Sequence, residues 1–514
     1  MKNFFSDLYP LWLFIAGFLG GTQFSLNNYP FLLVGSFAFF YLGLLSSQKS
    51  LFQSLIYAFS FGYGFFSYSH SWISQPLTAF GNLYLSIQPL VFVIVPAILA
   101  GYFVIIGMLN YALKFQAMGR VFALSLTTVL MEYLRCEYAP AVPLGQVGTV
   151  WLPITSFAQG AAIFGVYGLS FVTLLLSYSI GALKLSFRPF IISALICTSL
   201  FGWGRWRASN TNLAINEHIV RIVPTAWNQL DKYQSLENRI EHLKLLIDSS
   251  SGAFSNVPVL ILWPETTIEF SLLKHALGYD FIYPEIKIFL QKMLKKNSML
   301  LAGIVLRSSK NKAYNVLFGL TAADELSYVY KKRFLAPFGE FMPPVLRTIA
   351  NMFGIHALDD FMRGSDNQPL LVISQGLKIK PIICYEGSFT QQVLQPYQTA
   401  DLFVISTNDA WFRYNGKEQQ FISHAFRAIE EGVPIIRCAN IGFSGYVSPI
   451  GTYKVTLSDN PMNLRFHKPL PETPYRWITN YCPYWIELFL ILCVLIIFYL
   501  ELIARRKSKI NLSK

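Results

Sequence analysis

The N-terminal part of the chain is almost free of charge. Between Asp7 and Lys114 the only formally charged side chain is Lys49. A helix needs about 20 consecutive apolar residues to cross the hydrocarbon core of a bilayer, and only helices and closed barrels satisfy their backbone groups there. We therefore expect a polytopic α-helical membrane domain with about eight spans, seven before the central region and one after it. The approximate cores are Leu11–Leu26, Pro30–Ser47, Leu51–Ile73, Pro89–Leu113, Val121–Leu134, Ala161–Leu183, Pro189–Trp203 and Tyr484–Ala504.

Basic residues are distributed unevenly around these segments. The loops near Asn28 and Gly81 carry none. Because cytoplasmic loops are enriched in lysine and arginine, this bias predicts that both termini are cytoplasmic. The region between the seventh and eighth spans is then outside, in the periplasm of a Gram-negative cell. The basic residues on the cytoplasmic side of this alternation are Lys2, Lys49, Lys114, Arg120, Lys184, Arg188, Arg505, Arg506 and Lys507.

The composition excludes several other classes of protein. The chain is 53% hydrophobic and 13% charged, with a formal net charge of +13. No basic helix or zinc-finger spacing accompanies this charge, so we expect attraction to anionic lipid and no nucleic-acid partner. The seven histidines and six cysteines show no paired-ligand spacing, and we therefore predict neither a metal, nor another cofactor, nor a disulfide scaffold. The cysteines are Cys136, Cys197, Cys384, Cys438, Cys482 and Cys493.

The region from about His218 to Thr473 has the pattern of a water-soluble domain. Short β-branched runs alternate with segments of helical periodicity, which indicates a layered α/β sandwich. The continuous apolar character of the strands suggests that helices or a second sheet cover both of their faces. The predicted strands are Ile219–Val223, Val259–Leu262, Met299–Leu306, Val316–Leu320, Ile379–Ile383 and Leu402–Ser406, and the predicted helices are Asn238–Ser249, Glu285–Lys296 and Glu418–Glu431.

Three short sequence motifs at the ends of predicted strands contain side chains that can take part in catalysis. They supply a carboxylate, an ammonium group and a thiol: Glu265 after Leu262-Trp263-Pro264, a Lys331-Lys332 pair after Tyr330, and Cys384 after Pro381-Ile382-Ile383. A thiol beside a base and a cation is the set that acyl transfer through a thioester needs. Such neighbours are expected to keep the thiol partly as thiolate, its reactive form.

The order and surroundings of these phrases resemble the Glu-Lys-Cys triad of the nitrilase superfamily. The membrane segments narrow the resemblance to its membrane branch, the apolipoprotein N-acyltransferase family, supported by the family-like phrases Glu132-Tyr133-Leu134-Arg135 and Gly165-Val166-Tyr167-Gly168. The resemblance implies that the inserted domain is a nitrilase-like α-β-β-α sandwich. It also implies three parts: a transmembrane domain over 1–207, a catalytic domain on the outer face over 208–476, and a final helix with a basic tail over 477–514.

The same resemblance assigns roles to residues. Cys384 is expected to be the nucleophile, Glu265 the general base, and Lys332 the cation that stabilises the oxyanion. Lys332 rather than Lys331 fits the family spacing Tyr-x-Lys-x-x-Leu-x-Pro-Phe-Gly-Glu, and the two side chains should point to opposite faces of a strand. Supporting roles are expected for Glu340, Tyr385 and Glu386, and contacts with substrate for Tyr233, Phe338, Phe341, Trp411 and Phe412.

The activity implied by the resemblance is the last step of bacterial lipoprotein maturation in the inner membrane. A phospholipid, commonly phosphatidylethanolamine through its sn-1 chain, donates an acyl group to Cys384, and the group then passes in a ping-pong mechanism to the α-amino group of an N-terminal diacylglyceryl-cysteine. One alternative is a membrane-anchored amidase that uses the same triad on small substrates. A transporter with a soluble sensor domain is disfavoured, because most of the spans contain no ionisable residue.

Overall fold

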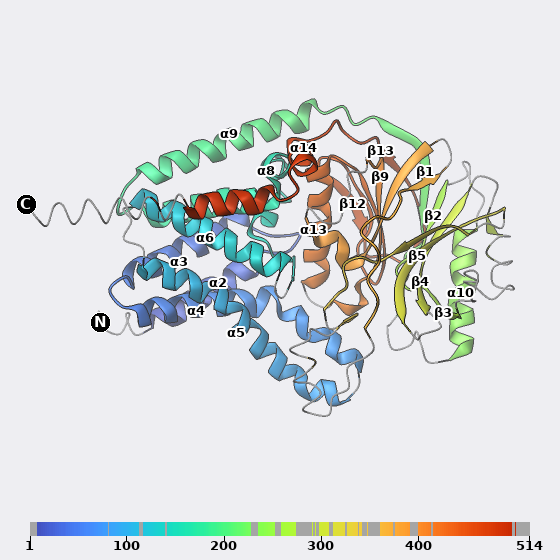
Figure 1. Ribbon diagram of the computed structural model, residues 1–514, viewed down its shortest axis with the longest axis horizontal. Coiled ribbons are helices and arrows are strands. Elements are labelled where there is room, and N and C mark those ends of the chain that lie inside the picture. Colours follow the sequence, from blue (N-terminus) through green and yellow to red (C-terminus); the bar gives the residue numbers. More distant parts are fainter. Residues whose placement is uncertain are drawn as a thin grey trace, which may run out of the picture. The chain divides into compact units, whose positions relative to one another are not determined.

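The computed structural model describes residues 8–80, 82–112, 117–138, 141–227, 235–251, 259–273, 290, 293–294, 298–307, 312–323, 326–337, 339–341, 347, 360–373, 376–390, 399–412, 415–495 and 499. The chain divides into two compact units. One comprises Met1–Thr211, Tyr414–Phe426 and Glu472–Lys514, and the other Asn212–Arg413 and Arg427–Pro471. The first unit is built of helices, and the second contains the β-strands (Figure 1).

A helix lies at each of the eight apolar segments that the sequence marks. They are α2 (Tyr9–Gly21), α3 (Pro30–Ser46), α4 (Leu51–Ser69), α5 (Asn82–Ala112), α6 (Ala117–Glu137), α8 (Ala161–Gly181), α9 (Arg188–Asn210) and the segment Trp485–Leu495 that follows α14 (Pro474–Tyr481). Short helical turns η1 (Ser71–Phe80), η2 (Val147–Trp151) and α7 (Thr155–Ala158) connect them.

Not all of these eight helices are long and apolar enough to cross a membrane. Among the described residues three are long and apolar enough, namely Gln88–Ala112, Ala117–Glu137 and Ala161–Gly181. A fourth is added if α14 and Trp485–Leu495, which are bent by 88° relative to each other, form one span. The coarse prediction of a membrane-embedded helical region is therefore supported, while the number of eight spans stays a prediction.

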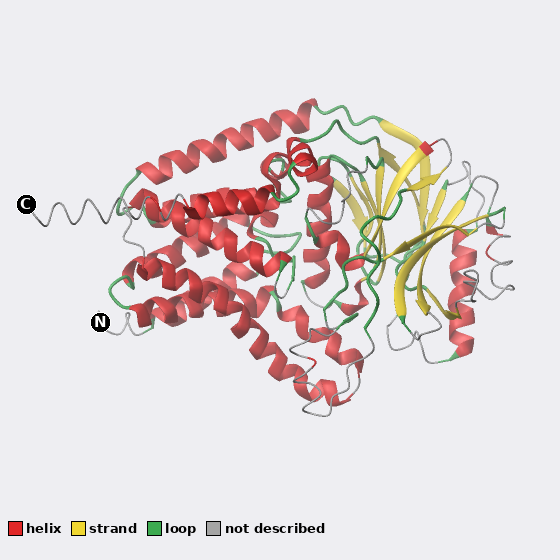
Figure 2. Cartoon of the chain, viewed as in Figure 1, coloured by secondary structure: helices red, strands yellow, loops and turns green. Residues whose placement is uncertain are grey.

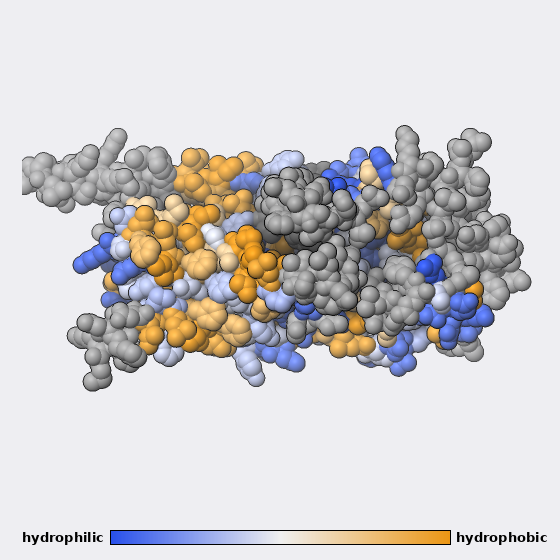
Figure 3. All heavy atoms as spheres, turned by 90° about the horizontal axis from the view of Figure 1, so that it is seen from below, coloured by the Kyte–Doolittle hydropathy of each residue, from blue (hydrophilic) through white to orange (hydrophobic). Residues whose placement is uncertain are grey.

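Small residues and aromatic rings hold the helical unit together. A Cβ atom added to Gly17 would lie 2.1 Å from the carbonyl oxygen of Phe61, and one added to Gly64 would lie 2.0 Å from that of Phe14. The backbones of α2 and α4 therefore touch, as small residues allow between membrane helices. Hydrophobic side chains also gather on the outer surface of this unit (Figure 3), where Phe52, for example, is 71% exposed.

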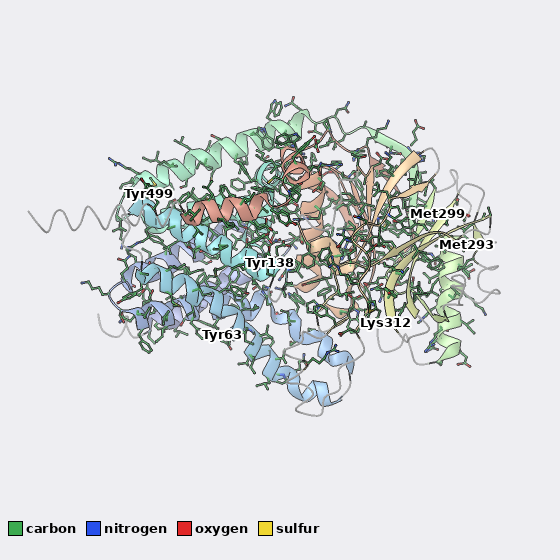
Figure 4. The ribbon with its side chains drawn as sticks, in the orientation of Figure 1. Tyr63, Tyr138, Met293, Met299, Lys312 and Tyr499 are labelled. Carbon is green, nitrogen blue, oxygen red and sulfur yellow. The ribbon has the colours of Figure 1, made fainter. Side chains whose placement is uncertain are left out.

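Polar side chains fix the end of α6. Arg135, which is buried, donates from Nη1 to the carbonyl oxygens of Val142 and Leu144 at 2.9 and 3.0 Å. Tyr138, labelled in Figure 4, follows α6 and donates from its hydroxyl to Glu487 Oε1 at 3.3 Å. These contacts tie α6 to the loop that follows it and to the helix at Trp485–Leu495.

The second unit contains two β-sheets. One has the strand order β13-β1-β2-β4-β5-β6, with β3 paired to β4, and the other has the order β12-β11-β10-β9-β8-β7. The central pairs β1/β2, β2/β4, β8/β9 and β9/β10 are parallel. The strands are β1 (Ile215–Ile222), β2 (Leu260–Leu262), β3 (Ile268–Leu273), β4 (Met299–Arg307), β5 (Ala313–Thr321), β6 (Leu326–Lys331), β7 (Leu371–Ile373), β8 (Leu377–Ile383), β9 (Leu402–Asn408), β10 (Ile435–Asn440), β11 (Ser444–Val447), β12 (Tyr453–Thr456) and β13 (Met462–His467).

The two sheets pack face to face. Ser406 of β9 donates from Oγ to the carbonyl oxygen of Trp263 at 3.0 Å, and Cys438 of β10 contacts that of Leu262 at 3.4 Å. The helix α10 (Leu236–Ser250) covers the outer side of the first sheet (Figure 2). The helix α13 (Gly416–Glu431) is divided between the two units, and its residues from Arg427 on belong to the second. The expected sandwich of two facing sheets with a covering helix is therefore confirmed.

Most predicted elements of this unit are present within a few residues of their expected bounds. The six predicted strands correspond to β1, β2, β4, β5, β8 and β9, and two predicted helices correspond to α10 and α13. The third predicted helix, 285–296, lies mostly outside the described residues. Short, continuously apolar runs were a sufficient signal here, because these strands are buried and bounded by turns.

Candidate active site

The three chemical groups expected from the sequence stand immediately after strands. Glu265 follows β2 through Trp263-Pro264, Lys332 is the residue after β6, and Cys384 is the residue after β8. All three are buried, with exposed fractions of 5%, 1% and 6%. Two strands of one sheet and one strand of the other therefore supply one site, in the layer between the two sheets.

The Glu265 carboxylate is held on both of its oxygens. Its Oε1 accepts a hydrogen bond from Asn315 Nδ2 at 2.6 Å and lies 3.2 Å from Lys332 Nζ. Its Oε2 accepts from the backbone N–H of Asn408 at 2.8 Å. Behind it, Gly303 of β4 passes so close that an added Cβ would lie 2.7 Å from the Glu265 Cα atom. The carboxylate is thus oriented by three donors.

Lys332 lies between two carboxylates. Its Nζ is 3.2 Å from Glu265 Oε1 and 2.9 Å from Glu340 Oε2. Burial alone would lower the pKa of Lys332, but the charges of Glu265, Glu340 and Cys384 raise it above its usual value. Lys332 is therefore a permanent cation in the site. Its neighbour Lys331 turns away and lies 4.6 Å from the centre of the Tyr314 ring.

The backbone at Cys384 is strained. Its φ angle is 51°, in the left-handed region that residues with a side chain rarely adopt. The chain turns there from β8 into a short 3-10 helix, η5 (Cys384–Ser388). A sharp turn at a strand end is a geometry that presents a side chain away from the strand axis. Strain of this kind, typically about 1–3 kcal/mol, persists where the surrounding structure holds it.

The surroundings of Cys384 favour the protonated thiol. Burial raises its pKa to about 12, and the Glu265 carboxylate adds to the increase, while Lys332 and Thr407 act in the opposite direction. The direction of this pKa shift is opposite to the sequence-based expectation of a partly ionised thiol, which stays a prediction. The two carboxylates and one lysine of the site already leave one negative charge in excess. A further negative charge on the Cys384 sulfur is therefore disfavoured. Glu265 is the nearby group that can accept the thiol proton.

Glu386 does not contact Lys332 but fixes the two strand ends. It is fully buried, and its Oε1 accepts from the Tyr330 hydroxyl at 2.7 Å and from the backbone N–H of Arg333 at 3.1 Å. Its Oε2 accepts from the backbone N–H of Ile383 at 3.0 Å. Glu386 therefore ties the end of β6, which carries Lys332, to the end of β8, which carries Cys384.

Asp409 provides a second buried anchor beside the thiol. Both of its carboxylate oxygens lie 2.9 Å from Arg437 Nη2 of β10, and Thr407 donates to Oδ1 at 2.8 Å. An added Cβ at Gly442 would collide with this carboxylate at 1.9 Å. The Asp409 charge is thus paired, and its loop follows β9 next to the Asn408 amide that binds Glu265.

The remaining expected residues are placed as follows. Tyr385 is buried, with its ring edge-on to Phe389 at 5.4 Å. Phe341 and Trp411 are half-buried, and Phe412 is buried. Tyr233 and Phe338 lie outside the described residues.

Sequence reasoning missed one residue of this site, Asn315. It is the third residue of β5, and its side chain donates hydrogen bonds to both Glu265 and Glu340. The only available signal was a polar residue within the apolar run Ala313–Thr321. Among the described residues no group of three or more histidine, cysteine, aspartate or glutamate side chains could hold a metal ion.

Two family models match the chain. The apolipoprotein N-acyltransferase N-terminal domain matches residues 16–179, and the carbon-nitrogen hydrolase model matches residues 222–466. The first match covers helices from α2 to α8, and the second covers the sandwich from the end of β1 to β13.

Curated relatives with the name apolipoprotein N-acyltransferase match over most of the chain. The protein of Allorhizobium ampelinum is 27% identical over 87% of this chain and 85% of its own length. The protein of Rickettsia prowazekii is 29% identical over 87% of this chain and 89% of its own length. The protein of Brucella suis is 27% identical over 85% of this chain and 83% of its own length.

A solved structure of an amidase from Nesterenkonia sp. aligns with 52% of this chain and 95% of its own, at 16% identity and a TM-score of 0.36. A likeness at this level adds nothing to the assignment, which depends on the family models and the curated relatives. Since these together span the helical unit and the sandwich, the chain belongs to the apolipoprotein N-acyltransferase family, within the nitrilase (carbon-nitrogen hydrolase) superfamily.

Proposed function

We propose that this protein transfers a fatty acyl chain from a phospholipid, through a thioester on Cys384, to the α-amino group of an N-terminal diacylglyceryl-cysteine of an apolipoprotein. The observation that carries the proposal is the buried group of Cys384, Glu265 and Lys332 in a chain that also has membrane helices. The names of the curated relatives support the same acyltransferase activity.

The first half-reaction forms the acyl-enzyme. Glu265 accepts the proton of the Cys384 thiol as the sulfur attacks the ester carbonyl carbon of the phospholipid, commonly at the sn-1 position of phosphatidylethanolamine. Lys332 stabilises the negative oxygen of the tetrahedral intermediate; loss of one such donor typically costs 10²–10³-fold in rate. The C–O bond then breaks, the thioester remains on Cys384, and the proton on Glu265 passes to the leaving lysophospholipid alkoxide.

The second half-reaction releases the acyl group to the acceptor. The α-amino group, with a reference pKa of about 7.7–8.0, attacks the thioester carbonyl in its neutral form. Glu265 accepts a proton from the attacking nitrogen and returns it to the Cys384 sulfur as the C–S bond breaks. The products are an N-acylated lipoprotein and the free thiol, which is the order of events in a ping-pong mechanism.

The membrane region fits lipid substrates of this kind. Withdrawing an acyl tail from the bilayer into water costs about 0.8 kcal/mol per CH₂ group, so a soluble enzyme would reach neither substrate easily. We therefore propose a transmembrane domain over 1–207, a periplasmic catalytic domain over 208–476 and a final helix with a cytoplasmic tail over 477–514. The proposal includes eight spans in the bacterial inner membrane, with both termini cytoplasmic.

Aromatic residues near the site are proposed to contact the acyl chains. Trp411 and Phe412 follow β9 directly after the Asp409 anchor, and Phe341 follows Glu340. Tyr233 and Phe338 are proposed for the same role from sequence. Tyr385 and Glu386 are proposed to support Cys384 by fixing the turn into η5.

A reconstituted reaction tests the proposal. The purified protein in detergent micelles with phosphatidylethanolamine and a synthetic diacylglyceryl-cysteine peptide is expected to add one acyl chain to the peptide amine, detected by mass spectrometry. Cys384→Ala should give no product. Release of free fatty acid without peptide acylation would instead favour an amidase-type hydrolase, and acylation by Cys384→Ala would contradict the mechanism.

A further inference from the structure

Asn315 contacts both of the carboxylates that lie beside Lys332. It lies on β5, is 3% exposed, and its backbone carbonyl oxygen accepts from the Lys332 N–H at 2.9 Å. Its side chain therefore points into the site from the strand that pairs with β6, the strand that ends at Lys331.

The side-chain amide of Asn315 bridges the two acids. Nδ2 donates to Glu265 Oε1 at 2.6 Å and to Glu340 Oε1 at 2.7 Å. A primary amide has two N–H donors and one acceptor oxygen, and here both donors are used. The Oδ1 atom has no hydrogen-bond partner among the described residues, so the two carboxylates alone decide which way the amide faces.

The Asn315 amide offsets the electrostatic repulsion between the two carboxylates. Glu265 and Glu340 both lie within 3.2 Å of Lys332 Nζ, and two anions that share one cation repel each other in a buried site. An amide that donates to both anions offsets this repulsion without adding a charge. An apolar residue there would leave the two carboxylates without these donors.

We propose that Asn315 is a positioning residue of the acyl transfer: it holds the Glu265 carboxylate in the place and orientation from which it accepts the Cys384 proton, and it holds Glu340 against Lys332. This inference rests on the proposed function, in which Glu265 is the base.

The charged groups that face the bridge come from several elements. Lys332 follows β6, Glu340 lies in the next loop, and Cys384 follows β8. The Asp409 carboxylate after β9 also acts on the Cys384 thiol, but it is paired with Arg437 of β10. The set therefore consists of two carboxylates that share one lysine, together with one neutral amide. Each substitution at Asn315 or Glu340 changes a member of this set.

The test measures the rate of acyl loading of Cys384 by intact mass, with phosphatidylethanolamine at saturating concentration in micelles. Asn315→Ala removes both donors, and a displacement of about 1 Å in a catalytic group can lower a rate on the order of 100-fold; we expect a loss of that size. Asn315→Asp places a third carboxylate against Lys332 and should load at least as slowly. Tyr314→Phe, the neighbouring position on β5, should load like the unsubstituted protein.

A reciprocal exchange distinguishes positioning from simple packing. Asn315→Asp combined with Glu340→Gln restores one amide and two carboxylates around Lys332, with the amide on the other side. We expect the combined variant to load about 10-fold or more faster than Asn315→Asp alone, a coupling that residues without a direct interaction do not show. Thermal unfolding of each variant shows whether it is folded. If Asn315→Ala does not fold, the comparison of the combined variant with Asn315→Asp alone decides the test.

Two results would overturn the inference: loading by folded Asn315→Ala within about twofold of the unsubstituted protein, or an exchange variant no faster than Asn315→Asp alone. Either result leaves the proposed function intact if Cys384→Ala still fails to load. If the unsubstituted protein itself never loads an acyl group, the proposed function and the inference that rests on it both fail.

Discussion

At the scale of single residues, the state of the Cys384 thiol decides how the reaction can begin. Burial and the Glu265 charge raise its pKa to about 12, so at neutral pH the resting group is a thiol. A protonated thiol is a poor nucleophile. The first step therefore depends on a base that takes the proton during the attack, and Glu265 is placed to do this.

This state predicts how Cys384 reacts with iodoacetamide. Since the thiolate is the reactive form and its fraction below the pKa grows about tenfold per pH unit, alkylation should be slow at pH 7 and should keep rising through pH 9 to 10. The measurement is peptide mass spectrometry of Cys384 after timed exposure, with Cys384→Ala identifying the peptide. A rate that already levels off near pH 7 would show an ionised thiol and contradict this account.

Glu386 supports a second prediction at this scale. Three donors converge on its carboxylate, from Tyr330, Arg333 and Ile383. Glu386→Gln removes the charge and one acceptor oxygen, which leaves buried donors unsatisfied at about 1–3 kcal/mol each. We expect a lower thermal midpoint and slower acyl loading. Glu472→Gln, at an exposed carboxylate, is the matched control and should change neither; an unchanged Glu386→Gln protein would refute the anchoring role.

At the scale of elements, the site is made by strand ends. β2, β6 and β8 each end just before a functional side chain, and the chain between them supplies the scaffold. The phrases around Glu265, Lys332 and Cys384 could be identified from sequence because each is local, a few residues long and next to a β-branched run. Their contact, 3.2 Å between Lys332 Nζ and Glu265 Oε1, required the fold.

Asn315 shows where sequence reasoning stops. Its bonding partners Glu265 and Glu340 are 50 and 25 residues away, and nothing within β5 distinguishes it from a polar residue on the edge of a sheet. The ionisation of Cys384 could not be predicted either, because it depends on how many carboxylates surround one lysine. The span count is a third limit, since Tyr9–Gly21 and Pro30–Ser46 are helical but only 13 and 17 residues long.

A glycine in β4 provides the prediction at this scale. A Cβ at Gly303 would lie 2.4 Å from the backbone N of Thr266 and 2.7 Å from the Glu265 Cα atom, and backbone cannot move aside as a side chain can. Gly303→Ala should therefore displace Glu265 and slow acyl loading, with about 1–3 kcal/mol lost in unfolding free energy.

Gly319→Ala is the matched control for this prediction. Its Cβ would meet the side chains of Tyr328 and Met299 at 3.0 and 3.1 Å, and the methionine can shift. It should load faster than Gly303→Ala. Equal loading by the two variants would mean that the close approach at Gly303 does not position Glu265.

At the scale of the whole molecule, one chain combines a helical unit with outward-facing apolar side chains and a β-sandwich that buries its chemistry. The combination suits substrates whose tails stay in a bilayer while their reactive ends are polar. The proposed topology puts the sandwich outside the cytoplasm, and it follows from lysine and arginine counts in short loops.

Cysteine labelling tests that topology. Lys49 lies between α3 and α4, and Lys454 lies on β12; both are exposed. In cells with a permeable outer membrane, a membrane-impermeant maleimide should label Lys454→Cys directly and Lys49→Cys only after the inner membrane is disrupted. The unsubstituted protein measures the background from the six native cysteines. The reverse pattern would place the sandwich in the cytoplasm.

The most direct test of the central claim is the mass of the intact protein after incubation with phosphatidylethanolamine and no acceptor. The account predicts one added acyl chain, removed by hydroxylamine as a thioester would be, absent from Cys384→Ala, and lost when a diacylglyceryl-cysteine peptide is added. An acyl adduct on Cys384→Ala, or acylation of the peptide without any adduct on Cys384, would contradict it.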